Sequence, residues 1–277
     1  MILVTGATGN AGGAVVRALV RTGEEVRALA RPSSRRPVFG EGVEVVTGDL
    51  NEPETLRPLL GGVEAVFLLS GYDGFEETLA ELSRAGVERV VLLSSSAAPG
   101  GDLSNAVARY HILSEQAVRG SALAWTFLQP NSFMTNTLRW VSQLREGDVV
   151  RAPFAGVRVA TIHPDDVGAV AAAALTSDAH YGRAYRLSGP ESLLPADCLG
   201  TLARVLGREL RFRGQSDEEA RAEMSEEMPP EYVEAFFKFF ADGDLDESEV
   251  LSTVQEVTGT PPRTFEAWAR EHAEAFR

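Results

Sequence analysis

Short apolar runs alternate with stretches of helical spacing through the first half of the chain. The apolar runs predict strands, and the helically spaced stretches predict helices. Runs such as Val90-Val91-Leu92-Leu93 are apolar throughout, which is typical of strands buried on both faces. The predicted strands are residues 2–4, 25–30, 43–47, 65–70, 89–95 and 123–128, and the predicted helices are residues 13–21, 74–85 and 104–119.

This alternation predicts right-handed βαβ units and a doubly wound parallel sheet, whose ligand binds at the carboxyl ends of the strands. Beyond residue 130 the pattern becomes mixed and mostly helical. We expect a Rossmann-type α/β domain over residues 1–150 and a smaller, mostly helical substrate-binding part over residues 151–277, both sharing one core. Beyond residue 130 the predicted strands are 158–162 and 184–187, and the predicted helices are 134–145, 165–175, 195–206, 218–240, 247–257 and 265–275.

Three glycines follow the first apolar run. The run Ile2–Val4 is followed by Gly6, Gly9 and Gly12, and then by helix-compatible sequence. Glycine lets the backbone approach a pyrophosphate, and a helix N-terminus offers free N–H groups and a partial positive charge. The spacing differs by one residue from the dehydrogenase pattern Gly-x-Gly-x-x-Gly. The turn predicts dinucleotide binding, with a purely structural turn as the alternative, and its other candidate cofactor residues are Thr8, Asn10 and Ala11.

The end of the second predicted strand carries no carboxylate, although NAD-binding proteins usually place one there for the ribose 2′-hydroxyl. The strand ends at Arg31, and Pro32-Ser33-Ser34-Arg35-Arg36 follows. Arginine and serine can hold a 2′-phosphate, and arginine can stack on adenine. We therefore expect NADP(H). The alternatives are a solvated basic loop, or NAD(H) bound without a ribose carboxylate.

Small and polar residues follow the next three predicted strands. Asp49 is a candidate acceptor for the adenine amino group, and its alternative role is to cap a helix that starts near Pro53. Small residues at the ends of the fourth and fifth strands leave room for ribose and nicotinamide, and their hydroxyls can bind either group. The further cofactor candidates are Leu50, Ser70, Gly71 and Ser94, and the substrate candidate is Ser95.

Composition excludes several classes of protein. No apolar run approaches the ~20 residues of a membrane helix, and Met1 opens directly into a strand rather than a signal peptide. The net charge is −14, and residues 216–256 carry most of the excess acid, which argues against nucleic acid as a partner. Cys198 is the only cysteine and is expected to pack in the core. We expect a cytoplasmic protein without an internal disulfide.

Motifs in the middle and at the end of the chain resemble one family. The glycine turn, Gly48-Asp49-Leu50 and Tyr110-His111-Ile112-Leu113-Ser114-Glu115 are similar to the NmrA-like family of atypical short-chain dehydrogenase/reductases, as are residues 124–131, 163–168, 185–190 and 258–265. The resemblance covers nearly the whole chain. It implies an NADP(H)-binding fold. The family includes quinone reductases, isoflavone-reductase-like enzymes and regulators that sense the nicotinamide redox state.

The chain departs from the ordinary short-chain dehydrogenases at their Tyr-x-x-x-Lys pair, in which lysine lowers the pKa of the tyrosine. Ser114 stands four residues after Tyr110, and Lys238 is the only lysine of the chain. Tyr110 and His111 remain as candidate catalytic residues that donate a proton or a hydrogen bond to a quinone oxygen. The alternative is structural: His111 and Glu115 lie four residues apart on one helix face and pair with each other.

The segment after the sixth predicted strand borders nicotinamide and substrate in the family. The resemblance assigns Gln129 and Asn131 to the cofactor, Asn131 through the carboxamide. It assigns Phe133 to the substrate, with core packing as the alternative. Asp165 is expected to cap the helix that follows it.

An aromatic stripe at helical spacing near residues 232–240 indicates core or homodimer packing, or else a lid over an aromatic substrate. The chain has four histidines, and because they are widely spaced we expect no metal site.

These observations favour an NADP(H)-dependent oxidoreductase acting on quinones or related conjugated aromatic compounds. Direct hydride transfer to an electron-poor ring depends mainly on positioning, so it suits a site without lysine better than reduction of aliphatic ketones does. A specialised form would tailor an aromatic polyketide by reducing a quinone to a hydroquinone that then reacts with oxygen. The alternative function is a non-catalytic NAD(P)-sensing regulator that binds a protein partner.

Overall fold

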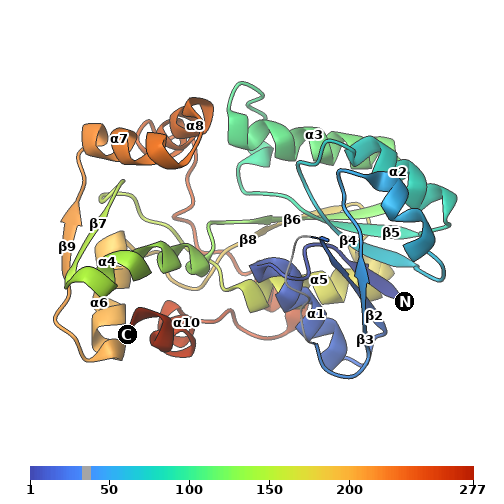
Figure 1. Ribbon diagram of the computed structural model, residues 1–277, viewed down its shortest axis with the longest axis horizontal. Helices are drawn as coiled ribbons and strands as arrows, with labels where there is room; N and C mark the ends of the chain where they lie inside the picture. Colours follow the sequence, from blue (N-terminus) through green and yellow to red (C-terminus); the bar gives the residue numbers. More distant parts are fainter. Residues whose placement is uncertain (33–38) are drawn as a thin grey trace.

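The computed structural model describes residues 1–32 and 39–277. Its main feature is a parallel seven-stranded sheet in the order β3-β2-β1-β4-β5-β6-β8 (Figure 1). A second parallel sheet pairs β7 with β9. The strands are β1 (Ile2–Val4), β2 (Val26–Ala30), β3 (Val43–Thr47), β4 (Ala65–Leu69), β5 (Arg89–Leu93), β6 (Ala124–Pro130), β7 (Val149–Ala152), β8 (Arg183–Leu187) and β9 (Arg211–Gly214).

Helices connect most of these strands. The α-helices are α1 (Asn10–Arg21), α2 (Phe75–Arg84), α3 (Ala106–Gly120), α4 (Val141–Glu146), α5 (Pro164–Thr176), α6 (Pro195–Leu206), α7 (Asp217–Glu227), α8 (Pro230–Phe240), α9 (Thr253–Thr258) and α10 (Phe265–Glu271). The 3₁₀ helices include η1 (Pro53–Thr55), η4 (Met134–Trp140) and η6 (Ala273–Phe276).

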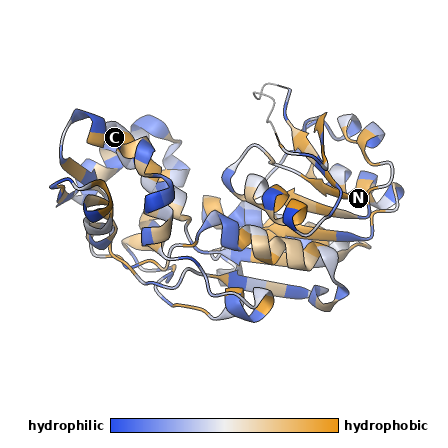
Figure 2. Ribbon diagram, turned by 90° about the horizontal axis from the view of Figure 1, so that it is seen from below, coloured by the Kyte–Doolittle hydropathy of each residue, from blue (hydrophilic) through white to orange (hydrophobic). Residues whose placement is uncertain are grey.

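Two helical layers cover the large sheet. Helices α1 and α5 pack together on one face, where Val15, Leu19 and Val170 are fully buried. Helices α2 and α3 cover the other face through Leu82 and Val118. The central strands, such as β4 and β5, are correspondingly hydrophobic (Figure 2). The doubly wound parallel sheet that the apolar pattern predicts is therefore confirmed.

The chain after β6 forms a second lobe beside the sheet (Figures 1 and 2). Its own core joins α4, α6, β7 and α10 around Trp268, whose side chain is fully buried. Cys198 packs in this core, and burial raises the pKa of its thiol to about 12, so it is an inert packing residue. Helix α5 and strand β8 nevertheless return to the large sheet, so the two lobes are interwoven in sequence.

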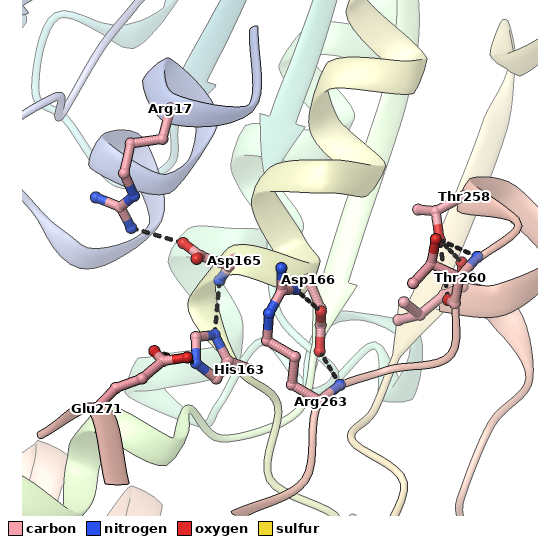
Figure 3. A network of polar contacts seen from close by, with 9 residues as sticks. Arg17, His163, Asp165, Asp166, Thr258, Thr260, Arg263 and Glu271 are labelled. Atoms are coloured by element: carbon pink, nitrogen blue, oxygen red, sulfur yellow. Dashed lines mark hydrogen bonds and ion pairs between the residues drawn. The ribbon is translucent and has the colours of Figure 1, made fainter. Parts of the chain in front are cut away.

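A polar network holds the C-terminal segment against α1 and α5 (Figure 3). Arg17 of α1 donates to Asp165 at 2.6 Å, and the buried Asp166 accepts hydrogen bonds from the backbone N–H and guanidinium of Arg263. The predicted cap of α5 was wrong by two residues. His163 is the cap, because its Nδ1 accepts from the backbone N–H of Asp165 at 3.0 Å while its Nε2 faces Glu271.

Several other boundaries differ from expectation. Residues 158–162 form only isolated bridges, through Val159 and Ile162, instead of a strand. The predicted helix 218–240 is two helices, because the Pro229-Pro230 pair interrupts it. Helix α9 begins only at Thr253, six residues later than predicted. Among the helices of the described ranges, none is both long and apolar enough to cross a membrane.

Candidate active site at the carboxyl edge of the sheet

The glycine turn between β1 and α1 forms a close-fitting backbone cradle. Gly6 has a φ of +61°, in the left-handed region. A Cβ at Gly12 would lie 2.2 Å from the carbonyl oxygen of Gly6, so only glycine fits there. Gly9 precedes α1 and supplies no side-chain cap. The first N–H groups of the helix are therefore free to bind an anion, and the turn fits a pyrophosphate.

The other predicted residues of the turn have different surroundings. Thr8 and Asn10 are exposed, and the Asn10 amide donates to the hydroxyl of Thr135 in η4 at 3.2 Å. This bond links the turn to the second lobe. Ala11 is buried in the core between α1 and the sheet, so it can contribute only its backbone.

Arg31 and Asp49 follow the ends of β2 and β3, and the charges of both act on Tyr72. Burial raises the pKa of Tyr72, and the charge of Arg31 opposes this rise while that of Asp49 adds to it. Arg31 is exposed and available to a ligand. No local sequence pattern indicates Tyr72, whose side chain packs against the core on the α2 and α3 face of the sheet. The predicted Ser33, Ser34, Arg35 and Arg36 lie outside the described residues.

Asp49 does not cap the helix that starts at Pro53, so that alternative is wrong. Its carboxylate accepts from the backbone N–H of Asn51 at 2.9 Å, and η1 has no side-chain cap. Leu50 is buried in the core, with an exposed fraction of 5%. Of these two residues, only Asp49 presents a polar side chain near Arg31.

The carboxyl ends of β4, β5 and β6 border a cavity of about 370 Å³, which we call the sheet-edge hollow. This is the place that the parallel topology predicts for a ligand. Its walls combine small polar groups from the strand ends with aromatic rings from α8. The lining includes Ser70, Ser94, Ser95, Tyr110, His111, Asn131, Ser132, Phe133, Phe236, Phe239, Phe240 and Glu247.

Tyr110 and His111 enter the hollow from α3, and both are electrically neutral near pH 7. Burial raises the pKa of the Tyr110 phenol, and burial lowers the pKa of His111 to about 4. The His111 Nδ1 lies 2.7 Å from the hydroxyl of Ser70. A Cβ at Gly71 would lie 2.9 Å from the Tyr110 ring, so this glycine makes room for the phenol. Both side chains can therefore offer hydrogen bonds, but neither is a strong acid.

Glu115 does not pair with His111. Its buried carboxylate instead accepts from the hydroxyl of Ser94 at 2.6 Å, the amide of Gln129 at 2.8 Å and the guanidinium of Arg119 at 3.0 Å. The predicted His111–Glu115 pair is wrong, because α3 turns Glu115 toward β5 and β6. Gln129 is thereby buried against Glu115, outside the lining of the hollow.

Asn131 and Glu247 form a second buried polar group on the opposite wall. The Asn131 amide nitrogen donates to the carbonyls of Ala160 and Glu247, at 3.3 and 3.0 Å. Because both contacts are carbonyl oxygens, the amide orientation is determined. Its Oδ1 is buried and has no hydrogen-bond partner among the described residues. Asn131 lines the hollow, and this oxygen is itself enclosed by protein.

Glu247 was missed in the sequence, where its segment was predicted as a helix. Its carboxylate is 4% exposed and accepts hydrogen bonds from the hydroxyl of Ser96, at 2.6 Å, and from both the N–H and the hydroxyl of Ser132. Burial raises the pKa of the carboxyl. The only sequence signal for a buried carboxylate here is the presence of serines at the strand ends. These serines do not identify which carboxylate accepts their hydrogen bonds.

A second cavity of about 370 Å³, the helical-lobe hollow, adjoins the first. The two share part of their lining: Ser132, Phe133, Asn136, Phe236 and Phe240. The aromatic stripe of α8 therefore has two roles. Phe237 packs in a small core and lines neither hollow, whereas Phe239 lines the sheet-edge hollow and Phe236 and Phe240 line both.

Comparison with known proteins agrees with this geometry. Residues 6–178 match a family described as NAD(P)H-binding. The chain is 43% identical to the (4-alkanoyl-5-oxo-2,5-dihydrofuran-3-yl)methyl phosphate reductase of Streptomyces griseus, over 100% of this chain and 99% of that one. It is 35% identical to the NAD(P)H azoreductase of Xenophilus azovorans, with the same coverage of both chains.

The fold is also shared with a solved complex. The NADPH-dependent quinone oxidoreductase of Escherichia coli complexed with NADPH superposes with a TM-score of 0.77, at 21% identity, over 98% of this chain and 99% of that one. Together with the cradle and the hollow, these similarities confirm the family and the cofactor. The chain belongs to the NAD(P)H-binding family, within the NmrA-like atypical short-chain dehydrogenase/reductases, and is an NAD(P)H-dependent oxidoreductase.

Proposed function

We propose that this oxidoreductase reduces electron-poor conjugated acceptors, namely quinones and related conjugated compounds, with NADPH as the hydride donor. The observation that carries the proposal is the neutrality of the donors at the sheet-edge hollow. Burial keeps the Tyr110 phenol protonated and His111 uncharged. The chain's only lysine, Lys238, contacts Ser104 at 3.5 Å and lies outside the lining of the hollow.

An isolated ketone becomes a strongly basic alkoxide when it accepts hydride, so its reduction depends on a matched proton donor. A conjugated acceptor spreads the new negative charge over several atoms. Hydrogen bonds from neutral groups such as Tyr110 and Ser95 are then sufficient, and positioning supplies much of the remaining catalysis. The hollow therefore suits conjugated acceptors.

The residues of the chain have distinct roles in this proposal. Bound NADPH supplies the hydride. The glycine cradle holds the pyrophosphate, Arg31 binds the 2′-phosphate, and Asn131 lies in the wall of the sheet-edge hollow where the carboxamide binds. Phe133, Phe236 and Phe240 surround a planar acceptor and exclude water.

The names of the relatives support the same class of acceptor. They describe reduction of a furanone phosphate, of azo compounds and of quinones. In each compound class, the reducible group is conjugated and electron-poor. We carry this shared property to the present chain, and not any one of those substrates.

The test is an acceptor panel at saturating NADPH, with loss of reduced-nicotinamide absorbance as the readout. The panel contains 1,2-naphthoquinone, an azo dye and cyclohexanone as the unconjugated control. We expect turnover with the first two and none with the third. Turnover of cyclohexanone at a comparable kcat/KM contradicts the proposal. Tight NADPH binding without turnover of any acceptor also contradicts it, and favours a non-catalytic sensor.

A further inference from the structure

Arg139 brings a positive charge into the helical-lobe hollow. It belongs to η4, the 3₁₀ helix that also carries Thr135, and its side chain lines the hollow. The other walls there are largely apolar and include Trp140, Phe154 and Met224. Arg139 is an exposed residue of the lining, and the protein groups around its guanidinium lower its pKa by partial desolvation.

The terminal nitrogens of Arg139 are unused. Its Nε donates to the carbonyl of Asn136 at 3.0 Å, which fixes the direction of the side chain. Neither Nη1 nor Nη2 has a hydrogen-bond or ion-pair partner in the described part of the chain. A guanidinium held in this way presents two parallel donors, the arrangement that binds carboxylate, sulfonate or phosphate bidentately.

The neighbouring charges do not neutralise Arg139. Arg151 and Glu223 also line the hollow, but they pair with each other at 3.5 Å. Glu227 of α7 also lines the hollow and is exposed, and its charge raises the pKa of Arg139 less than burial lowers it. Among the described residues that line the sheet-edge hollow, none is an arginine or a lysine. Arg139 is therefore the free cation of the combined cavity, within the described ranges.

We propose that the helical-lobe hollow binds an anionic group of the substrate through Arg139. This inference rests on the proposed function: the conjugated acceptor occupies the sheet-edge hollow, and its anionic substituent extends past Phe236 and Phe240 into the second hollow. The lining that the two hollows share makes this path continuous. The substrate class is thus conjugated acceptors that carry a carboxylate, sulfonate or phosphate.

A matched pair of quinones tests the charge preference. The probes are 1,2-naphthoquinone and 1,2-naphthoquinone-4-sulfonate, at saturating NADPH, with each rate corrected for the reaction of that quinone with NADPH alone. We expect the wild-type KM to be lower for the sulfonate by about tenfold or more, the effect of a charge-assisted hydrogen bond. Arg139→Gln should remove this preference through KM and leave the neutral quinone unaffected. Arg139→Lys should keep part of it.

Arg145→Gln is the control variant, because Arg145 is an exposed arginine of the neighbouring α4. It should retain the preference in full. Thermal melting of each variant shows whether it is folded. If Arg139→Gln does not fold, the comparison of Arg139→Lys with wild type decides, because a point charge should bind the sulfonate less well than the planar fork.

A binding measurement separates this inference from the proposed function. Naphthalene-2-sulfonate and naphthalene-2-sulfonamide are titrated by calorimetry into protein saturated with NADP⁺, which occupies the Arg31 site. Tighter binding of the sulfonate by wild type, lost in Arg139→Gln, supports the anion site even if neither quinone is reduced. Equal binding of the two compounds overturns the anion site, even if both quinones are reduced. A sulfonate preference that survives in Arg139→Gln also overturns it.

Discussion

Ser132 donates two hydrogen bonds to Glu247, from its backbone N–H at 3.0 Å and from its hydroxyl at 2.6 Å. The two residues are 115 positions apart in sequence. Ser132 borders both hollows, and Glu247 precedes the segment that returns to the sheet. This contact therefore joins the end of β6 to the C-terminal part of the chain at the wall of the candidate site.

Removal of the Glu247 carboxylate should destabilise the fold. Glu247→Ala leaves the buried hydroxyl of Ser96 and the half-buried hydroxyl of Ser132 without their acceptor. We expect the free energy of unfolding to fall by about 3 kcal/mol, the cost of losing hydrogen bonds to a buried charged group. Urea denaturation measures the change. Glu249→Ala is the control, because Glu249 is exposed, and a loss as large in this variant would contradict the assignment.

The raised pKa of Glu247 gives a signed pH dependence. Below the ordinary glutamate pKa both folded and unfolded chains are protonated, so the contribution of the group to stability is complete. As pH rises toward the higher folded-state pKa, the unfolded chain releases its proton first, and stability is lost. Wild type should therefore lose stability relative to Glu247→Gln as the pH rises above the ordinary glutamate pKa of 4.5. Parallel stability curves for the two proteins would be inconsistent with the buried carboxyl.

The lowered pKa of His111 gives the opposite dependence of stability on pH, because its folded-state pKa lies near 4, below the ordinary value of 6.5. Above pH 6.5 both states are neutral and the contribution is complete. As pH falls toward 4, His111 is protonated in the unfolded chain but stays neutral in the folded chain, so the free energy of unfolding decreases. Relative to His111→Gln, wild type should lose up to about 3 kcal/mol across this window. Urea unfolding at several pH values tests this, and a constant difference would refute it.

Arg31 should discriminate between the two nicotinamide dinucleotides. If it binds the 2′-phosphate, Arg31→Ala weakens NADPH binding by about tenfold and hardly changes NADH binding. Titration calorimetry measures both affinities. The control is Arg21→Ala, which removes an exposed arginine at the end of α1 and should change neither. Equal losses for NADPH and NADH in Arg31→Ala would argue against the phosphate role.

Gly12→Ala should abolish cofactor binding, because its Cβ would collide with the Gly6 carbonyl that shapes the cradle. The matched control is Gly200→Ala in α6, where an added Cβ meets nothing within 4 Å. It should bind NADPH normally and be slightly more stable, since alanine favours helix over glycine. Fluorescence of bound NADPH measures both variants. Unimpaired binding by Gly12→Ala would mean that the dinucleotide lies elsewhere.

Local patterns in the sequence predict the large sheet well. Buried parallel strands such as β5 are largely apolar, and glycines mark the turn before α1. The type and the order of these strands and helices can therefore be predicted from short-range patterns in the sequence. The cradle and the strand-end serines of the sheet-edge hollow follow from the same signals. Helix α6 matches its predicted bounds, because Pro195 starts it and Gly207 ends it.

The second lobe and the polar interior were harder to predict. Strands β7 and β9 have four residues each, too few for a clear alternation. Val159 and Ile162 are apolar because each contacts a distant segment, not because they form a strand. Glu247 has an ordinary acidic sequence context, and only the tertiary fold brings Ser96 and Ser132 to it. Long-range partners of this kind leave no local pattern.

The most direct test of the account follows a single turnover of bound NADPH. Protein loaded with NADPH, or with NADPH deuterated at C4 on the transferred side, is mixed rapidly with 1,2-naphthoquinone. We expect oxidation of the bound nucleotide far faster than the reaction in free solution, and slower with deuterium, because hydride passes directly to the acceptor in the sheet-edge hollow. Oxidation no faster than in free solution, or no dependence on the deuterium, would contradict the central claim.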